Sequence, residues 1–283
     1  MAGVLYVVPT PIGNMEDITL RALRVLAEVT LIAAEDTRSA RHLLEHHRIT
    51  APKLVSYFEG NEAARTDDLV ARVAAGEQIA LVSEAGMPGV SDPGARVIAA
   101  MRLAGQRVEV LPGASAALTA LVGSGLPTDR FLFVGFPSRQ QGERQQQFGA
   151  LRTERATLIV YEAPSRVGTT LADLAAALGG ARRAEVAREL SKLFEERIAG
   201  SLDELATRFA ETAPRGECVL VVAGASPGDD EYDEAPLDLE ADIRARLARG
   251  ERPKEIAAAL ALRTGKKRRE LYQLAVALDG STI

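Results

Sequence analysis

The sequence predicts an α/β protein made of two α/β domains followed by a small C-terminal helical domain. Three observations lead to this fold class. Short runs rich in valine, isoleucine and leucine alternate with segments of helical periodicity through the first half of the chain. This alternation changes near residues 112–113, where a second set of strands begins. A strongly acidic segment then precedes a strongly basic one near the C-terminus.

Composition narrows the class of protein. The chain has 283 residues, of which 47% are hydrophobic and 26% charged, a balance that excludes wholesale disorder and a fibrous repeat. The single cysteine excludes a disulfide framework and a multi-cysteine zinc site. No apolar run reaches the roughly 18 residues of a membrane span, and the N-terminus does not resemble a signal peptide. We therefore expect a cytoplasmic protein without a membrane partner.

The first domain is expected to span residues 1–112. Its predicted strands are short, rich in β-branched residues, and end near proline, glycine or a polar residue: 4–8, 30–34, 53–57, 79–83 and 107–111. The amphipathic segments between them predict helices at 18–28, 39–47, 61–75 and 94–104. This order implies a largely parallel sheet that is covered by helices on both faces.

The second domain is expected to span residues 113–225 and to begin with a helix of small residues at 114–123. Four further strands are predicted at 131–134, 157–161, 183–187 and 218–223, and a fifth at 197–201 stays open. Helices are predicted at 140–151, 167–178 and 202–211. A cleft between two such sheets is a usual place for a ligand.

The C-terminal region separates its charges along the chain. Residues 226–242 contain eight acidic residues and no basic one, and we expect an acidic linker at 226–236. Residues 244–269 contain ten basic and two acidic residues. Three helices, at 238–249, 253–262 and 266–278, predict a helical domain over 237–283. Its expected core consists of Ile256, Leu260, Leu271, Leu274 and Val276.

The net charge of −5 by itself argues against a nucleic-acid partner, but it sums these opposite segments. The basic run Lys266-Lys267-Arg268-Arg269 suits RNA phosphates, and a solvated helix face is the alternative.

Several familiar site motifs are absent. No G-x-G-x-x-G follows a strand, and there is no G-x-x-x-x-G-K-[ST] phosphate loop or H-E-x-x-H motif. His42 and His46 are spaced to share a metal, but the only other histidine is the adjacent His47, so a solvated helix face is favoured. We predict no metal site.

Two loops that follow predicted parallel strands are candidates for ligand binding. Residues 9–14 form a rigid turn with two prolines and one glycine. Residues 83–94 hold three glycines and two prolines but no lysine or arginine, which favours backbone recognition of a nucleoside-like, non-phosphorylated cofactor over a phosphate. A plain connection is the alternative in each case. Because open parallel sheets bind ligands at the carboxyl ends of their strands, both loops are well placed.

Polar clusters at 35–38, 161–166 and 188–192 also follow strands. Taken singly, each is explained by a helix cap or a surface ion pair. Taken together, they would line one cleft from both domains.

These motifs, in this order and spacing, closely resemble the ribosomal RNA small-subunit methyltransferase I family, which belongs to the tetrapyrrole-methylase-like class of S-adenosylmethionine enzymes. The resemblance runs from about residue 5 to residue 278 and rests on the motifs PTPIGN, AEDTR, SEAGMPGVSDPG, LPGASA, GLPTDRF, GFPSR, YEAPSR and REL-S-K. The sequence differs from the family pattern at Glu84 and Met87, where the family usually has aspartate and threonine. It also departs at 58–60, which lack the family's histidine.

The resemblance implies two α/β domains of tetrapyrrole-methylase type with S-adenosyl-L-methionine in the cleft between them. It implies methylation of the ribose 2′-hydroxyl of a cytidine in 16S rRNA at the decoding centre, with the rRNA within the 30S subunit, and a homodimer. Two alternatives stay open: a methyltransferase of small tetrapyrroles, which would need no basic tail, and a non-catalytic RNA-binding ribosome-assembly protein.

The resemblance and the loop positions together assign the candidate site residues. The cofactor-binding candidates lie on strand-to-helix loops: Pro11, Ile12, Ser83, Glu84, Ala85, Gly86, Pro88, Val90, Ser91, Ser115, Ala116 and Tyr161. The catalytic candidates are ionisable: Glu84, Lys192, Glu189, Glu162 and Asp36, with Glu35 as an alternative to Asp36. Lys192 would stabilise a developing alkoxide and Glu84 would accept the proton. The RNA-binding candidates are basic: Arg38, Arg166, Arg188, Lys266, Lys267, Arg268 and Arg269.

Overall fold

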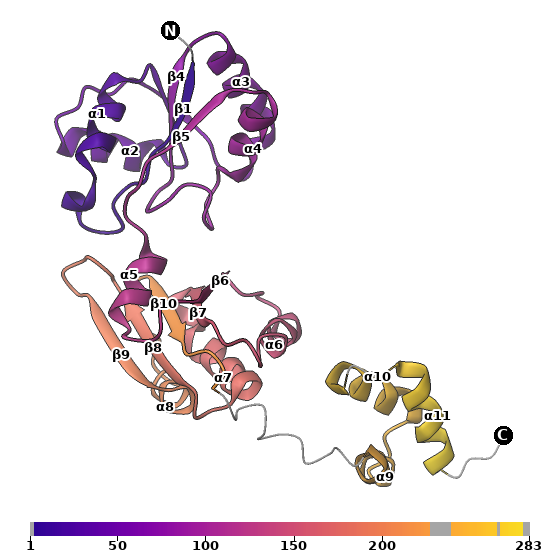
Figure 1. Cartoon of the computed structure of the whole chain (residues 1–283). Helices are drawn as coiled ribbons and strands as arrows, with labels where there is room; N and C mark the ends of the chain where they lie inside the picture. The colour runs from indigo at the N-terminus through magenta and orange to yellow at the C-terminus, as the bar shows by residue number, and fades with distance from the viewer. Residues whose placement is uncertain (1–2, 227–238, 265–266, 280–283) are drawn as a thin grey trace. The chain divides into compact units, whose positions relative to one another are not determined.

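The computed structural model describes residues 3–226, 239–264 and 267–279. Contacts divide the chain into two compact units, Met1–Ala225 and Ser226–Ile283 (Figure 1). The first unit holds both sheets and the second holds three helices. The fold class is confirmed, while the domain boundaries at residues 112, 225 and 236 stay predictions.

The first sheet is parallel throughout, as predicted. Its strands have the order β3-β2-β4-β1-β5. They are β1 (Val4–Val7), β2 (Leu31–Ala34), β3 (Lys53–Ser56), β4 (Gln78–Val82) and β5 (Arg107–Val110). Its covering helices are α1 (Leu20–Glu28), α2 (Thr37–His46), α3 (Glu62–Ala74) and α4 (Ala95–Leu103), and a short 3-10 helix η1 (Met15–Asp17) precedes α1.

Both faces of this sheet are buried. Leu26 and Leu44, on α1 and α2, belong to one core cluster, whereas Leu69 and Met101, on α3 and α4, belong to another. Figure 1 shows these helix pairs on opposite sides of the sheet. Alternate side chains of each strand therefore meet apolar partners on both faces, which explains the nearly continuous apolar runs.

The second sheet is mixed, with the order β6-β7-β10-β8-β9. Its strands are β6 (Phe131–Gly135), β7 (Thr157–Glu162), β8 (Arg183–Arg188), β9 (Glu196–Ser201) and β10 (Cys218–Val222). Only β6 and β7 pair in parallel, because β10 inserts antiparallel between β7 and β8, and β9 folds back onto β8. The strand that the sequence leaves open at 197–201 is therefore present as β9.

Helices also cover the second sheet on both faces. They are α5 (Ala116–Gly123), α6 (Gln141–Gly149), α7 (Val167–Leu178) and α8 (Leu202–Arg208), with the short 3-10 helix η2 (Pro164–Arg166) before α7. Leu121 of α5 packs in a cluster that also contains Ile12 of the first sheet's loop, whereas Phe148, Leu171 and Leu205 lie in the opposite cluster. The α5 face of the sheet is thus the face that meets the first sheet's loops.

The second unit contains α9 (Leu239–Ala248), α10 (Pro253–Thr264) and α11 (Arg268–Asp279). Ile256, Leu260 and Leu271 are buried as predicted, and Leu274 packs against them. Val276 is wrong as a core residue: Ala275 is buried instead, because residues four apart share a helix face with Leu271. The predicted linker lies outside the described residues except for Ser226. None of the described helices has the length and apolar character that crossing a membrane requires.

Candidate functional site

Two loops of the first sheet are joined into one rigid surface. Thr10 and Gly86 exchange backbone hydrogen bonds of 2.9 and 3.0 Å, and the Thr10 hydroxyl donates to the Ser83 carbonyl at 3.3 Å. Gly86 has φ +76°, a conformation that disfavours any side chain. The loops 9–14 and 83–94, which follow β1 and β4, are thereby locked together at the carboxyl end of the sheet.

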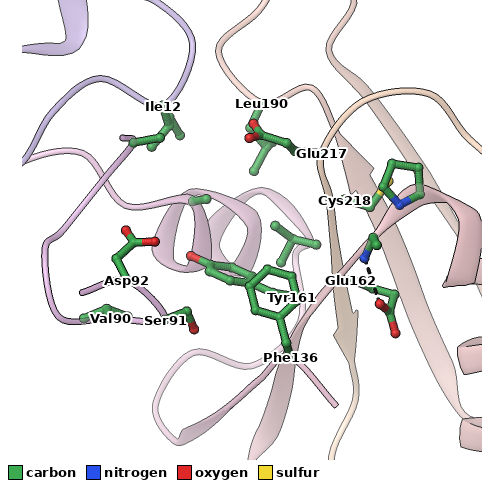
Figure 2. Close-up of a pocket in the computed structure, with 15 residues that line it drawn as sticks. Ile12, Val90, Ser91, Asp92, Phe136, Tyr161, Glu162, Leu190, Glu217 and Cys218 are labelled. Carbon is green, nitrogen blue, oxygen red and sulfur yellow. Dashed lines mark hydrogen bonds between the residues drawn. The ribbon is translucent and has the colours of Figure 1, made fainter. Parts of the chain in front are cut away.

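A cavity of about 240 Å³, here called the inner cavity, lies between these loops and the second sheet (Figure 2). Six of the predicted cofactor residues line it: Ile12, Ala85, Val90, Ser91, Ala116 and Tyr161. Further lining residues that the sequence did not single out for this role are Asp92, Phe136, Leu190, Glu217 and Cys218. The sequence thus located the loops but only part of the lining.

Aromatic side chains form one wall of the inner cavity. The Tyr161 ring packs edge-to-face against Phe133 and Phe136, with centroid distances of 4.9 and 5.5 Å. The Tyr161 hydroxyl accepts a hydrogen bond from the Ala117 backbone N–H at 3.1 Å, which ties the wall to the start of α5. Burial raises the pKa of Tyr161, so its hydroxyl stays protonated at neutral pH.

Asp92 is the main ionisable residue of the inner cavity that sequence analysis missed. The pKa of Asp92 is raised to about 6, mainly by burial and next by the nearby Glu35 carboxylate, while a hydrogen bond with Ser83 acts in the opposite direction. Ser91, immediately before it, has φ +62°, a left-handed conformation that is uncommon for a residue with a side chain. Such strained backbone persists where surrounding structure holds it, and it clusters at functional sites.

A larger and more open cavity of about 660 Å³, here called the outer basin, adjoins the inner cavity. Ile12, Ala85 and Glu217 line both. The outer basin also collects charged or titratable residues from both sheets: Asp36, Arg38, His42, Glu84 and Lys192. A molecule in one cavity can therefore meet a molecule in the other at the shared residues.

Lys192 is held as a cation in the outer basin. Its Nζ donates to Glu189 Oε1 at 2.9 Å and to Glu217 Oε2 at 3.0 Å. Burial favours the neutral amine, but the two carboxylates outweigh it and raise the pKa of Lys192. The bond from Lys192, in turn, lowers the pKa of Glu189. Glu189 is thus the counter-ion of Lys192 rather than a free base.

Backbone geometry brings this cluster together. Glu189 and Ser191 both have left-handed φ values, 52° and 65°. A Cβ at Gly13 would collide with the Lys192 side chain, and one at Gly216 would collide with the Glu189 carboxylate. Glycine at these two positions therefore permits the close approach of the first sheet's loop and of the segment before β10.

The two acidic residues after β2, Glu35 and Asp36, have different roles. Asp36 caps α2, accepting from the Arg38 backbone N–H at 2.7 Å, and the Arg38 guanidinium lowers its pKa to about 2. Burial raises the pKa of Glu35, which accepts from the Glu84 backbone N–H at 3.2 Å and is repelled by the Glu84 carboxylate. Asp36 is therefore a cap and an ion-pair partner, whereas Glu35 lies directly beneath the exposed Glu84.

Glu162 does not fit the catalytic role that the sequence suggested. Its fully buried carboxylate accepts from Arg166 Nε at 2.7 Å, from Thr170 Oγ1 at 2.5 Å and from the Ala163 backbone N–H at 2.7 Å. Figure 2 shows this carboxylate turned away from the cavity. Saturated in this way, Glu162 organises the turn between β7 and η2.

Two predicted RNA contacts are likewise occupied within the fold. Arg166 pairs with Glu162 and donates to the Pro137 carbonyl at 3.1 Å. Arg188 pairs with Glu196 at 2.7 Å. Both are mostly buried, so we do not retain them as phosphate contacts. Arg38 differs, since its side chain is 86% exposed at the outer basin.

The other predicted residues support the loops or lie elsewhere. Pro11, Ser83 and Glu84 line the outer basin, whereas Gly86 and Pro88 line neither cavity described here. Ser115 caps α5. Lys267, Arg268 and Arg269 are exposed at the start of α11, and Lys266 lies outside the described residues.

The lining residues that were not predicted differ in how far the sequence could have identified them. Asp92, Phe136 and Leu190 stand inside motifs that were recognised, whereas Glu217 precedes a strand without a distinctive pattern. Cys218, the single cysteine of the sequence, is buried in β10 and also lines the inner cavity. Within the described ranges, no three histidine, cysteine or acidic side chains are grouped to hold a metal ion. The prediction of a metal-free site stays a prediction.

Comparisons with known proteins agree with this architecture. The sequence profile of the tetrapyrrole (corrin/porphyrin) methylases matches residues 4–206. Ribosomal RNA small subunit methyltransferase I of Synechocystis sp. is 46% identical over 277 residues, which cover 98% of this chain and 99% of the relative. The protein of the same name from Pseudomonas aeruginosa is 43% identical over 284 residues, covering 99% of each.

Among solved structures, uroporphyrin-III-C-methyltransferase from Thermus thermophilus matches with a TM-score of 0.57 and 25% identity, covering 78% of this chain and 94% of that one. A uroporphyrin-III C-methyltransferase structure from the same organism, complexed with S-adenyl homocysteine, shares the fold with a TM-score of 0.54 and 21% identity, covering 78% and 97%. With the profile match and near-full-length relatives above 40% identity, the chain belongs to the ribosomal RNA small subunit methyltransferase I family, within the tetrapyrrole methylases.

Proposed function

We propose that this protein transfers a methyl group from S-adenosyl-L-methionine to the ribose 2′-hydroxyl of a cytidine in 16S rRNA, at the decoding centre of the 30S subunit. The observation that carries the proposal is the pair of adjoining cavities. A largely apolar inner cavity meets a charged outer basin at Ile12, Ala85 and Glu217. Family membership supports rRNA as the acceptor.

The inner cavity fits the proposed donor. Val90, Phe136 and Tyr161 offer apolar and aromatic surface for a planar base. None of its described lining residues is a lysine or arginine, so the cavity does not suit a phosphate. Backbone groups of the locked loop 83–94 and the Asp92 carboxyl supply polar partners. When bound there, S-adenosyl-L-methionine supplies an electrophilic methyl group on a sulfonium.

The residues of the outer basin suit the acceptor. In the transfer, the ribose oxygen forms a bond to the methyl carbon, the carbon–sulfur bond breaks, and the hydroxyl proton leaves. Most of the rate gain comes from aligning the three atoms. Lys192, held protonated, stabilises the charge that develops on the oxygen, and Glu84 accepts the proton, with Glu35 beneath it as the alternative acceptor.

Phosphate binding falls to arginine and lysine side chains outside the inner cavity. Arg38 is exposed at the outer basin, and Lys267, Arg268 and Arg269 are exposed on the second unit. Because phosphate contacts position RNA without reading bases, these residues set affinity and register. We further propose, from the family alone, a homodimer that acts in the cytoplasm.

The test is transfer of a labelled methyl group to 16S rRNA, both naked and within 30S particles, followed by mapping of the methylated nucleotide. Glu84→Gln and Lys192→Ala should lose transfer at saturating donor. Asp67→Asn and Lys53→Ala, at exposed positions that line neither cavity, are the matched controls.

Each contrary outcome has a meaning. Full transfer by both Glu84→Gln and Lys192→Ala overturns the catalytic assignment. Methylation of a tetrapyrrole with none on RNA favours the small-molecule alternative. Binding of RNA without any binding of the donor favours a non-catalytic assembly protein.

A further inference from the structure

The inner cavity is bordered by carboxylates from both sheets. Asp92 belongs to the loop after β4, and Glu217 lies immediately before β10. Figure 2 shows them on different walls of the cavity, with the Tyr161 ring extending toward Asp92. Both act on their surroundings: the charge of Glu217 raises the pKa of Asp92, and the charges of both raise the pKa of Tyr161.

The charge around this cavity is negative and incompletely balanced. Glu35 and Glu84 add to the repulsion that Asp92 experiences, and no lysine or arginine stands among the described lining residues. Among the cations that line the adjoining basin, Lys192 shares its Nζ between Glu189 and Glu217, and Arg38 pairs with Asp36. Asp92 therefore has a hydroxyl group, that of Ser83, as a hydrogen-bond partner. The charged groups near it are carboxylates. A cation in the inner cavity would relieve this repulsion.

We propose that Asp92, assisted by Glu217, is a specificity-determining residue that makes the inner cavity select the cationic methyl donor over its neutral product. This inference rests on the proposed function. S-adenosyl-L-methionine carries a sulfonium, whereas S-adenosyl-L-homocysteine has an uncharged thioether and lacks only the methyl group. Loss of the sulfur charge on transfer removes the attraction to Asp92, which promotes release of the product.

The expected effect follows from where this attraction operates. A carboxylate that attracts the sulfonium stabilises the bound donor before transfer. This attraction weakens as the sulfonium charge disappears, so the carboxylate raises the affinity for the donor rather than the rate of transfer. A charge pair several ångströms apart at a partly buried site changes affinity by about tenfold. Asp92→Asn keeps the shape and the hydrogen-bonding capacity but removes the charge.

The experiment is calorimetric titration of the full-length protein with S-adenosyl-L-methionine and, separately, with S-adenosyl-L-homocysteine. Asp92→Asn should weaken binding of the donor by about tenfold and change binding of the product by less than about twofold. Asp67→Asn, the same change at an exposed position on α3, should leave both affinities as in the wild type. Thermal unfolding of each variant verifies that it is folded.

A pH comparison adds a second readout. Between pH 7 and pH 5.5 the wild type should lose part of its preference for the donor, because Asp92 becomes protonated. Glu35, Glu84, Glu217 and Tyr161 face Asp92, so the pH response of Asp92→Asn is the reference that isolates the Asp92 contribution.

Two results are decisive in different ways. Equal weakening of donor and product by Asp92→Asn, or a preference that Asp92→Asn leaves intact, overturns the inference while leaving the proposed function in place. Failure of the wild type to bind either compound overturns the proposed function itself.

Discussion

The inner cavity and the outer basin adjoin and share three lining residues, but their other lining residues differ in chemical character. The inner cavity has aromatic and aliphatic walls and a locked backbone loop, and Asp92 is a partly buried carboxyl among its lining residues. The outer basin is lined by side chains that are ion-paired or exposed, such as Lys192, Arg38 and Glu84. We therefore expect substitutions in the inner cavity to alter binding of the donor, and substitutions in the outer basin to alter methyl transfer and RNA binding.

The largest effect is expected for Lys192→Ala. Loss of the cation beside the reacting oxygen should lower kcat by about 10²–10³-fold, the usual cost of removing one oxyanion-stabilising group. The dissociation constant of the donor, measured by calorimetry, should stay within about twofold, because Lys192 lines the basin and not the inner cavity. An equal loss in kcat and in donor affinity would contradict the assignment of separate roles to the two cavities.

Glu162→Gln should affect stability instead of chemistry. Removing the charge of this buried carboxylate leaves the Arg166 guanidinium without its counter-ion, and the free energy of unfolding should fall by about 3 kcal/mol. Glu84→Gln, the same substitution at an exposed carboxylate of the basin, should leave that free energy within about 0.5 kcal/mol. Denaturant unfolding measures both. A Glu162→Gln protein of wild-type stability would show that its network is dispensable.

A third test concerns the RNA. Replacing Lys267, Arg268 and Arg269 by glutamine should weaken binding of 16S rRNA by about tenfold. It should also reduce the slope of log affinity against log salt by about 2, because each phosphate contact releases counter-ions. Arg24→Gln on α1, whose side chain is 60% exposed, is the control. Unchanged affinity and slope in the triple variant would exclude the second unit from RNA binding.

The smallest expected effect is on stability and comes from Asp92→Asn. The pKa of Asp92 in the folded state, about 6, lies above its ordinary value of 3.8, so ionised Asp92 destabilises the native protein. That cost is absent below about pH 4, grows as pH rises, and is complete above about pH 6. Allowing for partial exposure, Asp92→Asn should raise the free energy of unfolding by about 1 kcal/mol at pH 7.5. The difference should vanish at pH 4, and a constant gap across this range would contradict the assignment.

The two sheets differ in how well they could be predicted. In the first, every strand and α-helix was expected within a few residues, because parallel strands buried on both faces leave uninterrupted apolar runs. In the second, the strands were located, with β9 only as an open possibility, but the insertion of β10 between β7 and β8 did not follow from local patterns. Pairing between strands distant in the chain depends on packing that no short window of sequence contains.

The candidate site shows the same division at the level of single residues. Motifs identified Ile12, Val90 and Tyr161, because strand-to-helix loops place ligands in a recognisable way. They also suggested Glu162, since a carboxylate after a strand looks alike whether it faces a cavity or an arginine. Glu217 had no signal, because its role depends on the glycine before it and on Lys192 from another loop.

The sequence by itself determined the fold class, the two loops that line the cavities and the opposite charges of the C-terminal segments, since all three follow from local periodicity, turn residues and composition. Only the tertiary structure decided which ionisable side chains face the cavities. Burial, ion pairing and charge repulsion act between residues far apart in the chain, and they separate Asp92 and Lys192 from Glu162 and Arg188.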